Sequence, residues 1–100
     1  MPPEPCCPHL HRAVELVGRR WTGAILAVLI DSREPLRFKE IAQAVPDLSD
    51  RLLTERVKEL EEHGILTRAE GHYGLTEKGR ALEPAITELR DWAQRWLAPR

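Results

Sequence analysis

The chain has 100 residues, of which 42% are hydrophobic and 31% charged, and its formal net charge is −1. This composition is typical of one globular domain, and the longest apolar stretch, residues 24–30, is far too short to cross a bilayer, so we expect no membrane contact. The start MPPEPCCP lacks a signal-peptide pattern, which predicts a cytoplasmic protein, and the weak net charge means that any nucleic-acid binding would depend on a few well-placed cations.

Prolines at positions 2, 3, 5 and 8 predict an extended N-terminal arm over residues 1–8, followed by a single domain over residues 9–100. Apolar residues at positions 10, 13, 14 and 17 predict a first helix that ends at Gly18. The apolar run 21–30 predicts a second helix that is buried almost all round, and residues 31–35 predict a turn before a short strand at 36–38.

A helix-turn-helix is predicted over about residues 38–63. The third helix of the chain carries one apolar stripe from Phe38 to Val45 and stops at Pro46. Ser49 is a favourable N-cap for the fourth helix, and Gly64 is expected at its C-cap. The inward stripe of this fourth helix is formed by Leu53, Val57 and Leu60.

Two short strands, 65–68 and 72–75, predict a hairpin, or wing, over about residues 65–75. Thr76 is expected to cap a last helix over about residues 77–97, kinked at Pro84. This helix has a coiled-coil-like apolar seam from Leu82 to Trp96, where its tryptophans fit a core or dimer seam better than a ligand pocket. The predicted fold class is therefore mainly α with a small β-hairpin: a winged helix-turn-helix with a C-terminal dimerisation helix.

The outer face of the fourth helix is the predicted DNA-reading surface, because helix-turn-helix proteins place base-contacting side chains near this N-terminal end. Ser49 is expected to present the helix end to a phosphate. The side chains on the outer face are Asp50, Arg51, Thr54, Glu55 and Lys58, and the candidate phosphate contacts around them are Arg37, Lys39, Arg68 and His72. The alternative is that this face is an ordinary solvated helix surface of mixed charge. Residues 47–63 hold three basic and six acidic side chains, a balance of 3 − 6 = −3.

The two cysteines, Cys6 and Cys7, are adjacent, and a disulfide between neighbours would close a strained ring. We therefore expect free thiols, metal ligands, or one sensor thiol beside a bystander. Pro8 suits the first helical position, which would put Cys7 at an N-cap, where the helix dipole lowers the pKa of a thiol. No metal is predicted, although Cys6, Cys7, His9 and His11 are weak candidate ligands.

Three stretches of the chain resemble the HxlR family of bacterial winged-helix transcriptional regulators, which are relatives of the MarR regulators. They are CPHLHRAVELVGRRWTGAIL, LRFKEIAQAVPDLSDRLLTERVKELEEHGIL and YGLTEKGRAL, and the match runs from about Cys7 to Trp96. Its most specific features are Cys7-Pro8, the step GRRW, Arg37-Phe38, Ser49 with Leu53-Thr54, Leu60-Glu61 with Gly64, and LTEKG at 75–79. The hairpin is shorter than is usual in the family, which puts Arg68 and His72 in doubt as DNA ligands.

The resemblance implies a homodimer, joined through its first and last helices, on a near-palindromic double-stranded DNA operator. The fourth helix would enter the major groove and the hairpin the minor groove. Some members sense electrophiles or oxidants at the position matched by Cys7, so oxidation could form a bond between subunits or a mixed disulfide and shift the dimer geometry. In this reading Cys6 is either a resolving partner or a bystander, and the alternative is a partly buried thiol at the dimer interface with no sensing role. The dimer interface is expected to contain Leu10, Val14, Leu82, Ile86, Leu89, Trp92 and Trp96.

No phosphate-binding loop, nucleophile elbow or metalloprotease motif is present in the sequence, so we expect neither an enzyme nor a cofactor. The predicted function is that of a homodimeric DNA-binding transcriptional regulator, a repressor on family grounds, which is released when Cys7 is modified by an oxidant or electrophile or when an unknown small-molecule effector binds. Two alternatives stay open. One is a metal-responsive regulator that uses Cys6, Cys7, His9 and His11, and the other is a winged-helix protein-interaction module that does not bind DNA.

Overall fold

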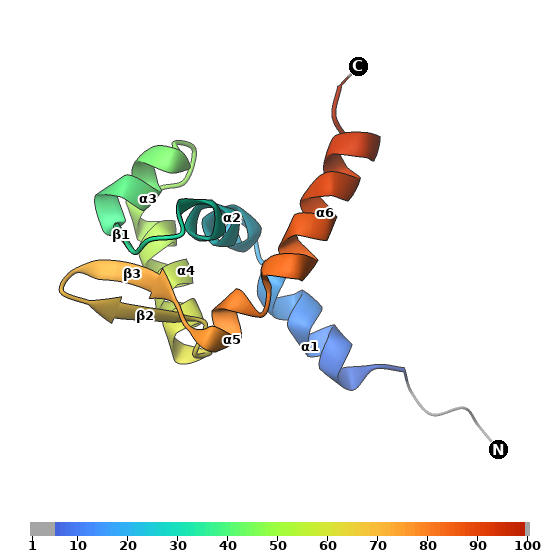
Figure 1. The fold of residues 1–100 in the computed structure, drawn as a ribbon, viewed down its shortest axis with the longest axis horizontal. Coiled ribbons are helices and arrows are strands. Elements are labelled where there is room, and N and C mark those ends of the chain that lie inside the picture. Colours follow the sequence, from blue (N-terminus) through green and yellow to red (C-terminus); the bar gives the residue numbers. More distant parts are fainter. Residues whose placement is uncertain (1–5, 100) are drawn as a thin grey trace.

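The structure is a computed structural model that describes residues 6–99, and it is a mainly helical winged helix-turn-helix with a small antiparallel sheet (Figure 1). The predicted fold class is confirmed. In chain order the elements are α1 (Pro8–Val17), α2 (Thr22–Ser32), β1 (Leu36–Arg37), α3 (Phe38–Ala44), α4 (Asp50–Glu62), β2 (Leu66–Ala69), β3 (His72–Leu75), α5 (Glu77–Arg80) and α6 (Glu83–Trp96).

Helix α2 lies at the centre of the core. Ile25 and Leu26 are fully buried, because α2 packs against α3, the sheet and α6 at the same time. This explains why the run 21–30 has apolar residues on every side of the helix. The rest of the core comes from α3, α4 and the wing, whose buried members include Ile41, Leu53, Leu60, Ile65 and Tyr73.

The helix-turn-helix forms where it was predicted. Ser49 caps α4, and its hydroxyl oxygen accepts a hydrogen bond from the Leu52 N–H at 3.2 Å. The far end of α4 differs by one residue from the prediction, because His63 is the cap residue and Gly64 follows it with a left-handed φ of +72°. Lys78 closes this end by donating a hydrogen bond to the His63 carbonyl at 2.7 Å.

The sheet has three strands in the order β1-β3-β2, where the sequence predicted a two-stranded hairpin beside a separate short strand. β1 pairs with β3 so that Leu36 lies opposite Tyr73, and Arg37 opposite His72. The wing turn consists of two residues, Glu70 and Gly71, both with positive φ (52° and 77°), which suits the right-handed twist of the two strands.

The predicted single helix over 77–97 is wrong in one respect. Thr76 caps a short helix, α5, that ends at Arg80, and a second helix, α6, starts at Glu83 with Pro84 in its first turn. Proline has no N–H to donate and fits the first turn of a helix, so Pro84 begins α6 rather than bending one continuous helix.

Helix α6 is fixed to α2 by an apolar contact and an ion pair. Ile86 is 6% exposed, and the Arg90 guanidinium donates two hydrogen bonds to the carboxylate of Asp31, at 2.8 and 3.1 Å. The hydrogen bonds from Arg90 lower the pKa of Asp31 below its ordinary value. Beyond this pair α6 leaves the core.

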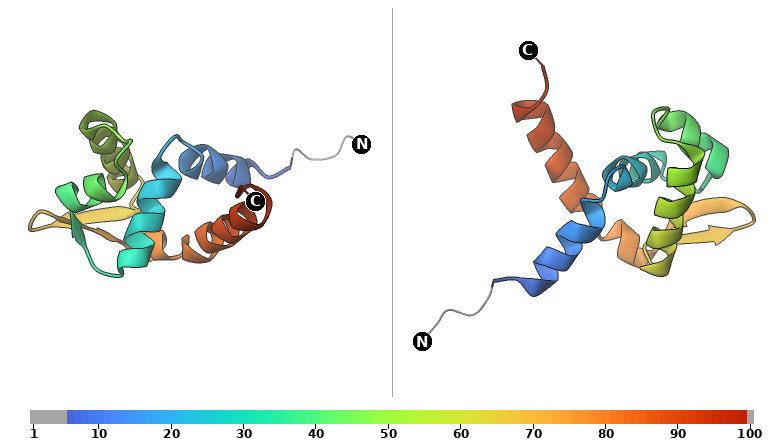
Figure 2. Two further views of the ribbon diagram at one scale, coloured as in Figure 1. Left: turned by 90° about the horizontal axis from the view of Figure 1, so that it is seen from above. Right: turned by 180° about the vertical axis from the view of Figure 1, so that it is seen from behind.

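Helices α1 and α6 diverge from the body of the domain at the end opposite the wing (Figures 1 and 2). Among the described residues of α1 none is buried. No helix within residues 6–99 is both long and apolar enough to cross a membrane. The predicted division into an arm over 1–8 and a domain over 9–100 stays a prediction, since α1 begins at Pro8 and residues 1–5 lie outside the described part.

Candidate nucleic-acid interface and thiol site

The predicted reading face of α4 is exposed. Arg51 is the most open of its side chains, 90% exposed, and its guanidinium lies 3.7 Å from the Glu55 carboxylate. This ion pair is weak in water, so Arg51 can exchange Glu55 for another acceptor at little cost. The Thr54 hydroxyl donates to the Asp50 carbonyl at 2.8 Å and keeps its oxygen free to accept a hydrogen bond. Lys58 completes the exposed face one turn further along.

Arg56 belongs to the core and not to this face. It is 9% exposed, and its Nε donates to the carbonyl oxygen of Arg20 at 3.0 Å. Arg56 was counted in the charge balance of residues 47–63 and was not among the predicted DNA contacts. Its position with Leu53, Val57 and Leu60 at i, i+3, i+4 and i+7 is the sequence signal that assigns it to the inward stripe.

Two of the acidic residues late in α4, Glu59 and Glu62, lie on the side that faces α1. Glu59 pairs with Arg19 at 3.0 Å, and both Glu59 and Glu62 line a groove of about 930 Å³ between α1, α4 and α5. Asp47, Asp50 and Glu55 lie near the N-terminal end of α4, so this end carries acidic as well as basic side chains. Arg51 in the first turn of α4 and Lys58 two turns further along are exposed cations of the helix.

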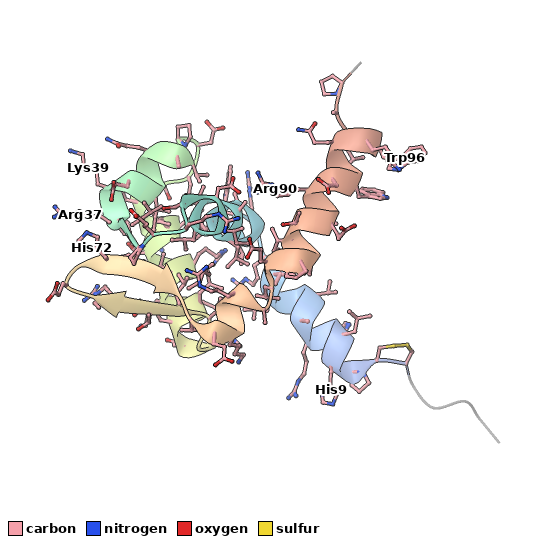
Figure 3. The ribbon with its side chains drawn as sticks, in the orientation of Figure 1. His9, Arg37, Lys39, His72, Arg90 and Trp96 are labelled. Atoms are coloured by element: carbon pink, nitrogen blue, oxygen red, sulfur yellow. A yellow bond between two sulfur atoms is a disulfide. The ribbon has the colours of Figure 1, made fainter. Side chains whose placement is uncertain are left out.

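A second cluster of polar side chains forms where β1, the start of α3 and β3 meet. Arg37, Lys39 and His72 gather along one edge of the molecule (Figure 3). Arg37 Nε donates to His72 Nε2 at 3.3 Å, while His72 Nδ1 lies 3.0 Å from the Glu70 carbonyl oxygen. Since Nε2 accepts, Nδ1 carries the proton in this arrangement. The cross-strand register of β1 and β3 brings Arg37 and His72 together.

Arg68 is held against its own wing. Its Nη1 donates to the Tyr73 hydroxyl at 3.2 Å, and its guanidinium lies 5.8 Å from the centre of the Tyr73 ring. The hydrogen bond to Tyr73 raises the pKa of Arg68 above its ordinary value. Arg68 and Tyr73 are opposite residues of β2 and β3, so the short wing uses its arginine for an internal contact as well as offering it to solvent.

The expectation of two free thiols is wrong, because Cys6 and Cys7 are joined in a disulfide. Cys7 is the N-cap residue of α1, as predicted, and has a left-handed backbone (φ 65°, ψ 49°). Both cysteines are exposed, and the disulfide lies at the free end of α1 (Figure 3). A disulfide sulfur does not ionise, so the lowered thiol pKa expected at this N-cap could apply only after reduction.

The nearby histidines do not complete a metal site with the cysteines. His11 Nε2 lies 2.8 Å from the Glu15 carboxylate, one helical turn along α1. Within residues 6–99, no three side chains among His, Cys, Asp and Glu are grouped so that they could hold a metal ion. The geometry therefore gives no support to a shared site of Cys6, Cys7, His9 and His11.

The predicted dimer residues divide into two groups. Ile86 is buried within the chain and Leu82 is partly buried against its core, so both contribute to the fold of the single chain, and their role between subunits stays a prediction. The others are exposed on α1 and α6, which end in open solvent (Figure 3). They are Leu10 (60%), Val14 (55%), Leu89 (60%), Trp92 (52%) and Trp96 (67%), and Leu97 (68%), which the sequence reading missed, continues this surface.

Known proteins resemble the chain along most of its length. Residues 16–100 match the HxlR-like helix-turn-helix family. The HTH-type transcriptional regulator YodB of Bacillus subtilis (strain 168) is 41% identical over 100 residues, with 93% of this chain and 88% of YodB covered.

Solved structures agree with this assignment. The quinone-bound crystal structure of YodB superposes with a TM-score of 0.81 at 44% identity, over 90% of this chain and 100% of that chain. The diamide-treated form of YodB superposes with a TM-score of 0.73 at 42% identity, over 93% of this chain and 97% of that chain. The redox regulator HypR in its oxidised form superposes with a TM-score of 0.79 at 31% identity, over 89% of this chain and 96% of that chain. The chain therefore belongs to the HxlR-like helix-turn-helix family and is a transcriptional regulator rather than an enzyme.

Proposed function

We propose that the protein is a homodimeric repressor that binds a near-palindromic double-stranded DNA operator and is switched at Cys7. The observation that carries the proposal is the open N-terminal end of α4. There Arg51 is 90% exposed at the start of the second helix of a helix-turn-helix. The other four predicted side chains of the reading face are exposed as well.

In the major groove, Arg51 would donate two hydrogen bonds to one guanine, for which it must leave Glu55. Thr54 and Glu55 would contact neighbouring bases, and Asp50 would face a base amino group. Ser49 keeps the first turn of α4 ordered, because its oxygen satisfies one of the N–H groups there, so the remaining N–H groups can meet a phosphate. Lys58 would add a phosphate contact one turn along.

The Arg37–Lys39–His72 cluster would grip the DNA backbone beside the reading helix. Arg37 keeps its Nη groups free while its Nε contacts His72, so it can bind a phosphate without leaving its neighbour. The role of Arg68 in the minor groove is the weakest of the ten DNA contacts proposed from the sequence, because its guanidinium is already stacked on Tyr73.

Two copies would join through the apolar side chains exposed on α1 and α6. Three of the five predicted residues that stay exposed lie on α6, which extends beyond its contact with α2. An arrangement of this kind leaves two copies of α4 at a fixed separation, as a near-palindromic operator requires.

The switch would act at the N-cap of α1. Cys7 lies on a helix that is expected in the dimer interface, so a change in its covalent state could alter how two α4 helices are spaced. The relatives YodB and HypR support this proposal, since structures are known for quinone-bound and diamide-treated YodB and for oxidised HypR. An oxidant or electrophile is therefore the proposed effector.

The test measures binding of the reduced protein to its own upstream DNA in a salt series, repeated after diamide treatment. We expect tight, steeply salt-dependent binding that diamide abolishes, and a Cys7→Ser variant whose binding resists diamide. Lys58→Ala removes one phosphate contact from each subunit and should lower the slope of log K against log salt by about 2, while Arg80→Ala, an exposed cation of α5, should leave it unchanged.

Each part of the proposal can fail separately. Binding that diamide does not change would remove the switch and leave the repressor. Absence of specific binding at low salt would refute DNA recognition and favour the protein-interaction module. A loss of binding that requires added zinc rather than diamide would favour the metal-responsive regulator.

A further inference from the structure

The adjacent cysteines provide two sulfur atoms that can act on one ligand. Because the structure joins Cys6 and Cys7 in a disulfide, both side chains reach the same side of the peptide unit between them. The pair is exposed and lies at the free end of α1, away from the core (Figure 3). When a monothiol reduces the disulfide, two neighbouring thiols face the solvent there.

The surroundings decide what such a pair can bind. Zinc usually takes four protein ligands, and no third ligand among the residues from 6 to 99 is grouped with these two sulfurs. The nearest imidazoles are on α1, where His11 is already paired with Glu15 at 2.8 Å. The site thus offers two soft donors and no more, which suits a soft element that needs two sulfur bonds.

We propose that the reduced Cys6–Cys7 pair is a bidentate binding site for trivalent organoarsenical compounds. In an arsenoxide, R–As=O, the arsenic bears one organic group and can form two bonds to sulfur. Two As–S bonds form, the two S–H bonds break, and the oxygen leaves as water with both protons. Arsenic stays trivalent, so the binding step consumes no oxidant or reductant.

Reduction of the disulfide comes first and is a separate step. Two equivalents of a monothiol open the S–S bond, and they leave as their own disulfide while Cys6 and Cys7 each gain a hydrogen. Once one As–S bond has formed, the second is intramolecular. Linked binding of this kind strengthens retention by roughly 10²- to 10⁴-fold over a single bond.

The arsenical site would use the same two cysteines as the proposed switch. Any effect of the arsenical on DNA binding therefore rests on the proposed function. An arsenical on both sulfurs would occupy the atoms that oxidation joins. Binding itself needs no DNA, so it can be measured even if the chain proves to have no operator.

The test uses the full chain, reduced with dithiothreitol and freed of it, and then treated with phenylarsine oxide. Intact-protein mass spectrometry should show one phenylarsenic group on each single chain. An excess of 2-mercaptoethanol should remove it at least about 100-fold more slowly than it does from a single-cysteine variant, whereas 2,3-dimercaptopropanol should remove it quickly.

Cys6→Ser and Cys7→Ser should each lose this retention, and both should fold, since the replaced side chains are exposed. His11→Ala is the matched control on the same helix and should retain the arsenical like the parent chain. Equal retention in either serine variant would overturn the proposal, as would an arsenic that bridges two chains or the absence of an adduct. If the chain retains the arsenical but binds no DNA, the proposed regulatory switch is refuted and the arsenical-binding site is supported.

Discussion

Two arginines on α4, five positions apart, have opposite environments. Arg51 is 90% exposed and touches Glu55 loosely, while Arg56 is 9% exposed and donates to the Arg20 carbonyl at 3.0 Å. Arg20 belongs to the turn between α1 and α2, so Arg56 ties the reading helix to that turn. One arginine is thus available to a ligand and the other holds the domain together.

This contrast predicts a separation of stability from DNA binding. Arg56→Ala should lower the free energy of unfolding by about 1–3 kcal/mol, because a buried hydrogen bond and the packing of the aliphatic stem are lost. Arg51→Ala should change it by no more than about 0.5 kcal/mol, yet weaken specific DNA binding by about 1–3 kcal/mol. Urea unfolding and an operator titration measure the two quantities.

The two variants serve as controls for each other. If Arg51→Ala destabilises the fold as much as Arg56→Ala does, the exposed face is structural and the proposed reading role fails. If Arg56→Ala is fully stable, its hydrogen bond to Arg20 contributes nothing and the assignment of Arg56 to the core is wrong.

The sequence identified residues well where local chemistry decides their position. Ser49 and Thr76 were predicted as caps because their hydroxyls can accept from the N–H groups of the next turn, and both do. The state of Cys6 and Cys7 was missed, since the strain expected in a ring between neighbouring cysteines argued against the disulfide that joins them. Arg56 was missed because its charge was counted before its place on the apolar stripe.

At the scale of elements, α5 depends on one glycine. Gly79 is buried where α5 crosses the start of the wing, and a Cβ added there would overlap the backbone carbonyl of Ile65. Backbone cannot rotate away as a side chain can, so the crossing tolerates only glycine. Thr76 fixes the same crossing, because its N–H donates to the Ile65 carbonyl at 3.0 Å.

We therefore expect Gly79→Ala to lower the free energy of unfolding by about 1–3 kcal/mol, the usual cost of overpacking. Gly23→Ala is the matched control, since a Cβ at Gly23 in α2 would meet no atom within 4 Å. It should leave stability unchanged or raise it by up to about 1 kcal/mol, because alanine is the better helix former. Thermal or urea unfolding measures the stability of both variants. Equal changes in the free energy of unfolding would show that the contact between α5 and Ile65 is not close-packed.

Element boundaries were predictable only as far as local signals reached. Pro84 indicated a disturbance of the last helix, but whether it bends that helix or begins another depends on how Ile86 docks on α2. Strand β1 has two residues and no periodicity of its own, so its pairing with β3 depends on residues some 35 positions away. Such tertiary contacts are outside what a local pattern encodes.

At the scale of the whole molecule, the chain has a closed side and an open side. The wing and helix-turn-helix enclose the core, while α1 and α6 extend from it with leucine, valine and tryptophan side chains exposed. Exposed apolar residues that gather on helices projecting from a domain usually mark an interface. The interface expected from the sequence and the family resemblance includes these exposed side chains, together with Ile86 and Leu82, which pack against the core.

The dimer can be tested by placing a charge on this surface. Trp96→Glu combined with Leu89→Glu should weaken self-association by at least about 100-fold, since buried aromatic residues dominate interface energies and an unpaired carboxylate opposes burial. Sedimentation velocity over a concentration series would measure the effect. Gln94→Glu, an exposed polar position between the two on α6, should not change the association.

The same variant determines how dimerisation contributes to DNA binding. A dimer places two α4 helices and two Arg37–Lys39–His72 clusters on one operator, so each half supplies its own phosphate contacts. A monomer would keep half of these, and the slope of log K against log salt should fall to about half of its value for the parent chain. A monomeric variant with the full slope would mean that one subunit makes every phosphate contact, which contradicts a near-palindromic site.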